Sequence, residues 1–154
     1  MRPSLAFLLP LVLVVAAVRE SAVCNTYQYS AAAVSAAVDA ACPRVKKSTT
    51  VGDNSYPHRY NNYEKFSLKG LSGPFYEFPI MSNGQVYYGG NPGPDRVILT
   101  KDCTTAGVLT HQGAANNAFL ECRMIPTSSA STVLSDTRSL LAIYLAMMTL
   151  VFAA

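Results

Sequence analysis

Apolar residues are concentrated in two blocks at the ends of the chain, and the region between them mixes apolar and polar positions. The first block, residues 5–18, follows the basic Arg2 and ends in small residues that suit signal-peptidase cleavage. The pattern predicts a secretory signal peptide within residues 1–22. Cleavage after Ala17 and cleavage after Ala22 both fit the sequence.

The second apolar block, residues 140–154, has fifteen residues without a charge. A membrane-spanning helix needs about twenty apolar residues, so this block is short for a span. It fits better the removable tail of a glycolipid (GPI) anchor signal, which follows small attachment residues and a polar spacer. Residues 124–139 are rich in Ser and Thr and would supply both: Ser128, Ser129 and Ala130 as the attachment site and Ser131–Ser139 as the spacer. A retained C-terminal membrane helix is the alternative.

Residues 23–123 remain between these ends and have the length of one ordinary domain, about 100 residues. Ser30 followed by AAAVSAAVDAAC predicts an N-capped helix made of strong helix formers, which we expect to end at Pro43. Its helical spacing predicts a buried stripe of four small apolar residues: Val34, Ala37, Val38 and Ala41.

The rest of the domain is interrupted by Gly and Pro and contains short runs that alternate like strands. The predicted strands are Pro57–Tyr60, Phe75–Ile80, Arg96–Thr100, Ala106–His111 and Ala118–Cys122. One helix followed by several strands favours an α+β fold, in which a small antiparallel sheet packs on the helix.

Three strands carry one titratable or charged group each. In the strand PFYEFPI, alternation puts Glu77 on the face opposite the apolar side chains, and Arg96 likewise opposes its apolar neighbours. His111 ends the run AGVLTH. If all three faced the same side they would form a catalytic floor; the alternative is a set of charges at exposed edges. Periodicity alone does not choose between the two.

Four cysteines lie inside the domain: Cys24, Cys42, Cys103 and Cys122. In a small secreted domain this even number predicts two disulfides, for which three pairings are possible. The chain has no CxxC pair, and neither histidine has zinc-finger spacing from a cysteine, which disfavours a metal site. Residues 23–123 hold nine Lys/Arg and seven Asp/Glu, so their net charge of +2 gives only weak support for a polyanionic partner.

The segment SYPHRYNNYEKF, residues 55–66, gathers three tyrosines, two adjacent asparagines, a histidine and a glutamate. Aromatic faces stack on bases, while amide and carboxylate groups bind base edges, so this composition favours a nucleobase site on single-stranded nucleic acid. An ordinary tyrosine-rich loop is the alternative.

Five sequence blocks extend in order over most of the domain from Cys24 to Cys122: SYPHRYNNYE, FYEFPI, YGGNPGPDRV, GVLTHQGA and FLEC. In order and spacing these blocks resemble the fungal guanyl-specific extracellular ribonucleases, members of the small microbial ribonuclease superfamily. The resemblance implies one helix packed on a small, strongly curved antiparallel sheet. It also implies a monomeric endonuclease that needs no cofactor and no metal and cuts single-stranded RNA 3′ to guanosine.

By this resemblance the catalytic positions are Glu77 as general base, His111 as general acid and Arg96 as the group that stabilises the phosphate. Tyr56, His58 and Phe119 complete the catalytic set. RNA cleavage requires a base for the ribose 2′-hydroxyl, an acid for the departing 5′-oxygen and positive charge near the phosphorane. We expect the nearby cations to keep Glu77 ionised. A second assignment makes His58 the base, with Glu77 orienting it.

The resemblance also assigns the guanine site. Tyr60 and Tyr63 would stack on the two faces of the base, and Glu64 would accept hydrogen bonds from its ring NH and exocyclic amine. The remaining contacts, mostly from the backbone, would come from Asn61, Asn62 and Asn117. The implied disulfides are Cys24–Cys122 and Cys42–Cys103.

Two positions depart from the family pattern. Lys65 replaces the usual glycine, so a positive φ there would be strained. Many family members have glycine before the asparagine of the second loop and another asparagine after it. The loop here reads QGAANNAF and lacks that glycine, so Asn116 is an alternative to Asn117. Neither change removes a catalytic side chain, but both would affect guanine affinity or base preference. The alternative to an active enzyme is a ribonuclease-like binding protein with weak or no catalysis, which loss of catalytic side chains would support.

Overall fold

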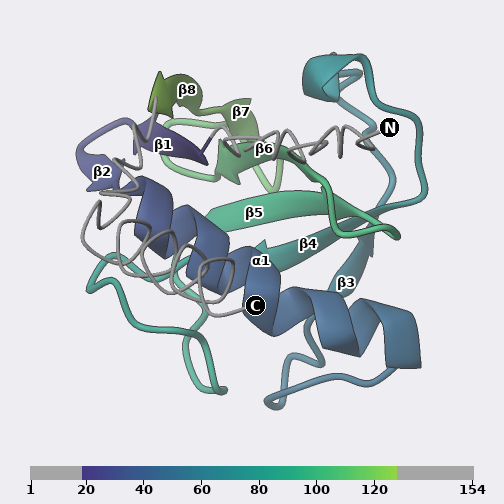
Figure 1. Cartoon of the computed structure of the whole chain (residues 1–154). Coiled ribbons are helices and arrows are strands. Elements are labelled where there is room, and N and C mark those ends of the chain that lie inside the picture. The colour runs from purple at the N-terminus through teal and green to yellow at the C-terminus, as the bar shows by residue number, and fades with distance from the viewer. Residues whose placement is uncertain (1–18, 128–154) are drawn as a thin grey trace, which may run out of the picture. The chain divides into compact units, whose positions relative to one another are not determined.

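The computed structural model describes residues 19–127, which form two antiparallel sheets and one long helix (Figure 1). The elements in chain order are β1 (Arg19–Cys24), β2 (Tyr27–Tyr29), α1 (Ala31–Lys47), β3 (His58–Tyr60), a short 3-10 helix η1 (Leu68–Gly70), β4 (Phe75–Pro79), β5 (Asp95–Thr100), β6 (Thr105–Thr110), β7 (Leu120–Glu121) and β8 (Arg123–Thr127). This arrangement confirms the predicted α+β fold.

Helix α1 begins as predicted, because the Ser30 side chain accepts a hydrogen bond from the Ala33 N–H at 3.1 Å. The predicted stripe is buried, and Val45 extends it by one turn. The predicted end at Pro43 is wrong, since the helix continues to Lys47. Proline removes one N–H but tolerates helical φ, and packing of the following turn outweighs that loss. The helix ends where Ser48 adopts a left-handed conformation, with φ of 54°.

The larger sheet has the strand order β3-β4-β5-β6-β7, and all its neighbours are antiparallel. Its two faces bury separate clusters. One packs with α1 and includes Phe78, Val97 and Val108. The other includes Phe75 and Ile98 and lies on the opposite face. A register shift between Ile98 and Leu99 marks a β-bulge, a feature that bends a strand.

The smaller sheet, in the order β2-β1-β8, extends beyond the predicted domain limits of 23 and 123. Strand β1 begins at Arg19 and pairs with β8 from Arg19↔Thr127 to Val23↔Arg123. Ala22 is fully buried in this sheet, and an ion pair joins Glu20 of β1 to Lys69 of η1. Neither β1 nor β8 was predicted, because β1 directly follows the apolar leader-like block and β8 begins the segment that was expected to be a polar spacer.

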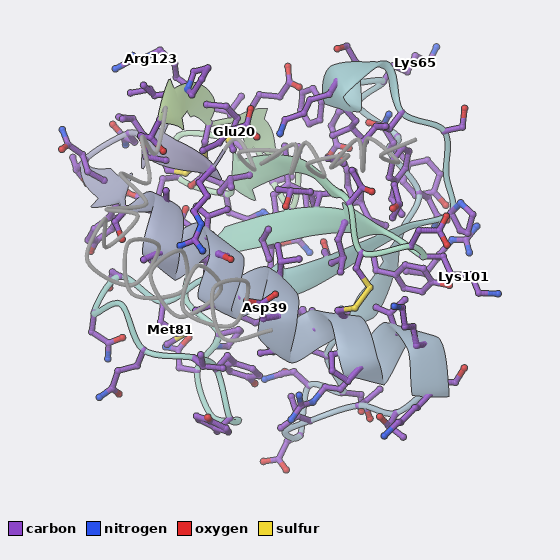
Figure 2. All side chains as sticks on the ribbon, in the orientation of Figure 1. Glu20, Asp39, Lys65, Met81, Lys101 and Arg123 are labelled. Atoms are coloured by element: carbon purple, nitrogen blue, oxygen red, sulfur yellow. A yellow bond between two sulfur atoms is a disulfide. The ribbon has the colours of Figure 1, made fainter. Side chains whose placement is uncertain are left out.

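Both disulfides implied by the resemblance are confirmed, and Figure 2 draws disulfides as yellow bonds. Cys24–Cys122 closes a loop of 98 residues and fastens β1 beside β8. Cys42–Cys103 ties α1 to the turn between β5 and β6. On a chain-entropy account, the longer crosslink contributes about 4 kcal/mol to stability.

Within residues 19–127, no helix combines the length and apolar character needed to cross a membrane. The predicted signal peptide lies mostly outside the described residues. The predicted anchor attachment site at 128–130 and the apolar tail at 140–154 lie entirely outside them.

Candidate functional site

The sheet register places three of the predicted catalytic groups, His58, Glu77 and Arg96, on one face, the face turned away from α1. Glu77 pairs with His58 on β3 and with Ile98 on β5. Arg96 lies two residues from Ile98, so its side chain leaves the strand on the same side. Cross-strand pairing therefore resolves for Glu77, His58 and Arg96 what periodicity left open.

His111 belongs to the same face. Arg96 pairs with Leu109 on β6, and His111 follows Leu109 by two residues, just beyond the end of that strand. Its N–H is held by the carbonyl of Pro94 at 3.0 Å. We refer to Tyr56, His58, Glu77, Arg96 and His111 together as the polar cluster.

His58 has an acceptor at each ring nitrogen. Its Nδ1 lies 3.3 Å from Glu77 Oε1, and its Nε2 contacts the backbone carbonyl of Asn54. The ring also stacks on Tyr56, with centroids 4.1 Å apart and an interplanar angle of 17°. A ring with acceptors on both sides is best satisfied when both nitrogens carry a proton.

Arg96 is 4% exposed and is fixed by neutral oxygen atoms. Its Nε donates to the Tyr56 hydroxyl at 3.0 Å, and its Nη1 donates to the carbonyls of Gly93 and Asp95, each at 2.8 Å. The guanidinium carbon lies 5.0 Å from the Tyr56 ring centroid. Because these partners carry no formal charge, the positive charge of Arg96 remains available to an anion.

Two opposing effects set the pKa of Glu77. Burial raises the pKa, and the charges of Arg96, His58 and His111 lower it; the net shift is upward. The expectation that nearby cations keep this carboxylate ionised therefore omitted the larger effect. Burial likewise raises the pKa of Tyr56, against the influence of Arg96. A carboxylate with a raised pKa is a stronger base than an ordinary one.

His111 is held by Phe119 and by the backbone beside it. The two rings stack with centroids 3.8 Å apart at 26°, and Nδ1 lies 2.8 Å from the Ala118 carbonyl. A carbonyl can only accept, so the proton is on Nδ1. This leaves Nε2 as the ring nitrogen that can exchange a proton with a substrate.

The loop of residues 60–66 follows β3 and wraps around Glu64. One oxygen of Glu64 accepts from the Tyr60 hydroxyl at 2.8 Å, and the other accepts from the Phe119 N–H at 3.0 Å. Burial opposes ionisation of Glu64, but hydrogen bonds from its own N–H, from Tyr60 and from Phe119 lower its pKa overall. The pKa of Tyr60 is raised by its burial and by Glu64. Tyr63, in contrast, is 83% exposed.

Asn62 organises the backbone of the 60–66 loop. Its side chain accepts from the Phe66 N–H and donates to the Phe66 carbonyl, both at 2.8 Å. Asn62 and Lys65 both have positive φ, 53° and 61°. Asparagine tolerates this region, but lysine does so only at a cost in free energy. Lys65 thus has the positive φ that would be strained for a residue other than glycine. Asn61 donates to the Tyr63 hydroxyl at 3.3 Å.

The loop before Phe119 contains the two alternative asparagines. Asn116 has φ of 53°, and both Asn116 and Asn117 are exposed. The Ala118 N–H bonds to the Ala115 carbonyl at 3.1 Å, so a tight turn carries the pair next to His111 and Phe119.

Two contributors to the site were not predicted. Tyr87 is 2% exposed and packs edge-on against Tyr56 with centroids 5.6 Å apart. Asn54 acts on His58 through its backbone carbonyl, which residue type does not reveal. For Tyr87, the adjacent tyrosines in VYYGG are the signal in the sequence that could have indicated a role. Among residues 19–127 there is no cluster of three or more His, Cys, Asp or Glu side chains suited to a metal ion.

Residues 17–123 match a family model described as ribonuclease. Guanyl-specific ribonuclease Th1 of Trichoderma harzianum is 55% identical to this chain over 103 residues, which cover 67% of this chain and 97% of that protein. Guanyl-specific ribonuclease T1 of Aspergillus oryzae is 50% identical, with 64% of this chain and 75% of that protein covered. Extracellular guanyl-specific ribonuclease Fl1 of Gibberella baccata is 48% identical, with 67% and 96% covered.

A solved structure agrees with these relatives. The ribonuclease He1 of Hericium erinaceus matches with a TM-score of 0.50 and 36% identity, and the match covers 67% of this chain and 98% of that chain. The family model spans well over half of the 154 residues and includes the whole polar cluster. The chain therefore belongs to the ribonuclease family that includes the fungal guanyl-specific enzymes.

Proposed function

We propose that this protein is a secreted, guanyl-preferring endoribonuclease that cleaves single-stranded RNA 3′ to guanosine. The observation that carries the proposal is the convergence of Glu77, His58, Arg96 and His111 on one face of the sheet, next to a loop built around Glu64. The guanyl-specific names of several relatives at 48–55% identity support the choice of base.

In the first step Glu77 accepts the proton of the ribose 2′-hydroxyl, and the 2′-oxygen attacks phosphorus. His111 Nε2 gives its proton to the departing 5′-oxygen, so one proton is taken and one is returned. The guanidinium of Arg96 stabilises the charge on the phosphorane oxygens. The product is a 2′,3′-cyclic phosphate. Water then hydrolyses it to a 3′-phosphate with the two roles exchanged.

The geometry supports Glu77 rather than His58 as the base. Both nitrogens of His58 face acceptors, Glu77 Oε1 and the Asn54 carbonyl, so this ring is suited to donating hydrogen bonds. His58 then orients the carboxylate and lowers its pKa, which balances part of the effect of burial. Tyr56 positions His58 and Arg96. Its ring stacks on His58, and its hydroxyl accepts a hydrogen bond from Arg96.

Guanine recognition is assigned to the 60–66 loop. Tyr60 and Tyr63 would enclose the base, while Glu64 would accept from its ring NH and exocyclic amine. The backbones of Asn61, Asn62 and Asn117 would supply the other contacts. Glu64 already accepts from the Tyr60 hydroxyl and the Phe119 N–H, and its remaining acceptor sites would gain two charge-assisted hydrogen bonds from guanine. Adenine lacks that pair of donors and would gain neither, which discriminates against it.

Maturation is assigned to cleavage after Ala17. Cleavage after Ala22 would remove most of β1, including the fully buried Ala22 and the ladder from Arg19 to Ala22 that pairs with β8. The expected N-terminus is therefore Val18, and Edman sequencing or intact mass of the secreted product tests it. An N-terminus at Val23 contradicts this assignment.

The C-terminal segment is assigned to a GPI anchor attached within residues 128–130, directly after β8 ends at Thr127. Treatment of intact cells with a phospholipase specific for such anchors should release the enzyme into the medium. Surface enzyme that resists release contradicts the anchor. We also propose that the released domain acts as a monomer. Light scattering after gel filtration measures its molar mass and tests this.

The central test uses the mature protein and a single-stranded RNA with several guanosines, in the presence of a metal chelator. Mapping of the fragment ends should show cuts 3′ to guanosine that disappear in a Glu77→Ala variant. Cuts that require a divalent metal would overturn the proposal.

A further inference from the structure

We propose that Tyr88 is a stacking platform for a nucleobase of the RNA that lies outside the guanine pocket. The large apolar side chains classed as exposed within residues 19–127 are Tyr27, Tyr63, Tyr88 and Leu120. Tyr63 and Tyr88 are much the most exposed, at 83% and 77%. Tyr63 has a role in the proposed guanine site, and Tyr88 has none there.

Tyr88 is placed by its neighbour Tyr87, whose ring is directed inward. Tyr87 packs edge-on against both Tyr56 and Phe78, with centroids 5.6 and 5.9 Å apart. Its hydroxyl donates to the Gly90 carbonyl at 3.0 Å. Since Tyr87 is 2% exposed and Tyr88 77%, consecutive rings lie on opposite sides of the backbone. Tyr88 is thus one residue from a ring that touches the polar cluster.

The backbone after Tyr88 is locked to the turn that carries Tyr56 and His58. A Cβ added to Gly52 would lie 2.7 Å from the Gly89 Cα, so these two backbone segments touch without room for a side chain. Asn54 donates from its side chain to the Gly90 carbonyl at 3.2 Å, and its own carbonyl holds His58. Figure 1 shows the β4–β5 connection and the segment after α1 both running below the sheet.

The same connection also holds Arg96. The Pro92 and Gly93 carbonyls accept from Arg96 Nη1 at 3.3 and 2.8 Å. Tyr88 is therefore attached to a segment that contacts the polar cluster at both ends, through Tyr87 on one side and Arg96 on the other. An exposed ring on so constrained a backbone loses little conformational freedom when a base stacks on it.

The chemistry of the partner follows from these positions. A single-stranded RNA held by guanine at the 60–66 loop and by its phosphate at the polar cluster continues past that cluster. Its next bases have no duplex partner and can stack on any exposed aromatic ring. Such stacking depends little on base identity and contributes about 1–3 kcal/mol per base. Tyr88 would therefore favour longer RNA rather than a particular flanking base.

This inference rests on the proposed function, and the test separates the two. It compares kcat/KM for hydrolysis of guanosine 2′,3′-cyclic phosphate, which has no second base, with that for cleavage of a pentanucleotide with one central guanosine. Tyr88→Ala should lower the value for the pentanucleotide by about 5- to 150-fold, which corresponds to the stacking energy of one base. The value for the cyclic phosphate should change less than about two-fold, because this substrate has no base outside the guanine pocket. The matched control, Tyr88→Phe, retains the ring and should match the wild type on both substrates.

Two further arms make the outcome decisive. Replacing one flanking nucleotide at a time by an abasic one in the wild type should reproduce the loss on either the 5′ or the 3′ side, which locates the base. Equal effects of Tyr88→Ala on both substrates, or none on either while its melting temperature is unchanged, overturn the platform. If the wild type cleaves neither substrate, the proposed function itself is wrong.

Discussion

The polar cluster and the 60–66 loop lie on the same side of one sheet but are held in place by different means. In the polar cluster, Glu77 and Arg96 project from paired strands, and side-chain bonds to Tyr56 and His58 fix their ends. In the loop, the only strand residue is Tyr60, and the rest depends on turns closed by Asn62 and on two positive φ values.

This difference separates the expected consequences of mutation. In the proposed mechanism side chains carry the chemistry of the polar cluster, so replacing one should remove a chemical step while the strands remain. In the proposed guanine site the backbone of the loop supplies much of the binding surface, so substitutions there should change affinity and base preference more than they change turnover. The predictions below test this separation and run from the largest expected effect to the smallest.

Glu77→Ala should lower kcat/KM on single-stranded RNA by about 10²- to 10⁴-fold, the usual range for loss of a general base. The strand should persist, since Glu77 is flanked by the buried Phe78 and paired on both sides. Steady-state kinetics and the melting temperature are measured together. Near-normal turnover would remove Glu77 as the base. In that case a His58→Ala variant should show the large loss instead.

His111→Ala should lower kcat on ordinary RNA by about 10²-fold or more, since the 5′-oxygen then leaves without a proton. A substrate with an activated leaving group, such as a p-nitrophenyl ester of guanosine 3′-phosphate, needs no acid and should lose far less. The ratio of the two rates is the measurement. Equal losses on both substrates contradict a general-acid role and indicate that His111 acts in binding or packing.

Strand alternation indicated which side of its own strand Glu77 and Arg96 each occupy, because each has a buried apolar neighbour that fixes the face. These neighbours are Phe78 and Val97. Alternation could not show that these faces coincide, which depends on the pairing of Glu77 with Ile98. Nor could it show the carbonyl of Asn54 at His58, because every residue type offers the same carbonyl.

Glu64→Ala should reduce the preference for guanosine over adenosine by about 10- to 100-fold, the effect of losing hydrogen bonds to a charged group. Turnover at saturating substrate should fall much less, since Glu64 does not belong to the polar cluster. Rates on the dinucleoside phosphates GpA and ApA provide the ratio. A uniform loss on both substrates, with an unchanged ratio, contradicts the role of Glu64 in base selection.

Glu77→Gln should stabilise the fold at neutral pH more than at pH 3. Burial raises the pKa of Glu77 in the folded state, so the folded protein holds this proton to higher pH than the unfolded chain. Stability is therefore lost as the pH rises from the pKa of Glu77 in the unfolded chain through its pKa in the folded protein. Glutamine does not ionise and avoids that loss. Urea unfolding at both pH values measures it. An equal effect at both would mean that His58 and Arg96 fully offset burial.

The structure departs from the predicted fold at two places, and at both the burial of side chains in the tertiary structure outweighs the local sequence signal. The helical Pro43 in α1 depends on burial of Val45, and strand β1 (Arg19–Cys24) depends on burial of Ala22; both burials involve distant partners. Local signals, a helix-breaking proline and a leader-like apolar block, favoured the opposite conclusion. Lys65 differs, because there the local rule was sound and the strained conformation is present.

Lys65→Gly should produce the smallest effect, a gain of about 1 kcal/mol in the free energy of unfolding. Lys65 has φ of 61°, where a side chain costs about 1–2 kcal/mol, and glycine recovers part of this while adding freedom to the unfolded chain. Its N–H already bonds to the Asn62 carbonyl at 3.0 Å, so the turn should be retained. Because the proposed role of the 60–66 loop is in binding, KM for RNA should fall slightly and kcat should stay constant. A changed kcat with constant KM would mean that this loop and the polar cluster are not separable.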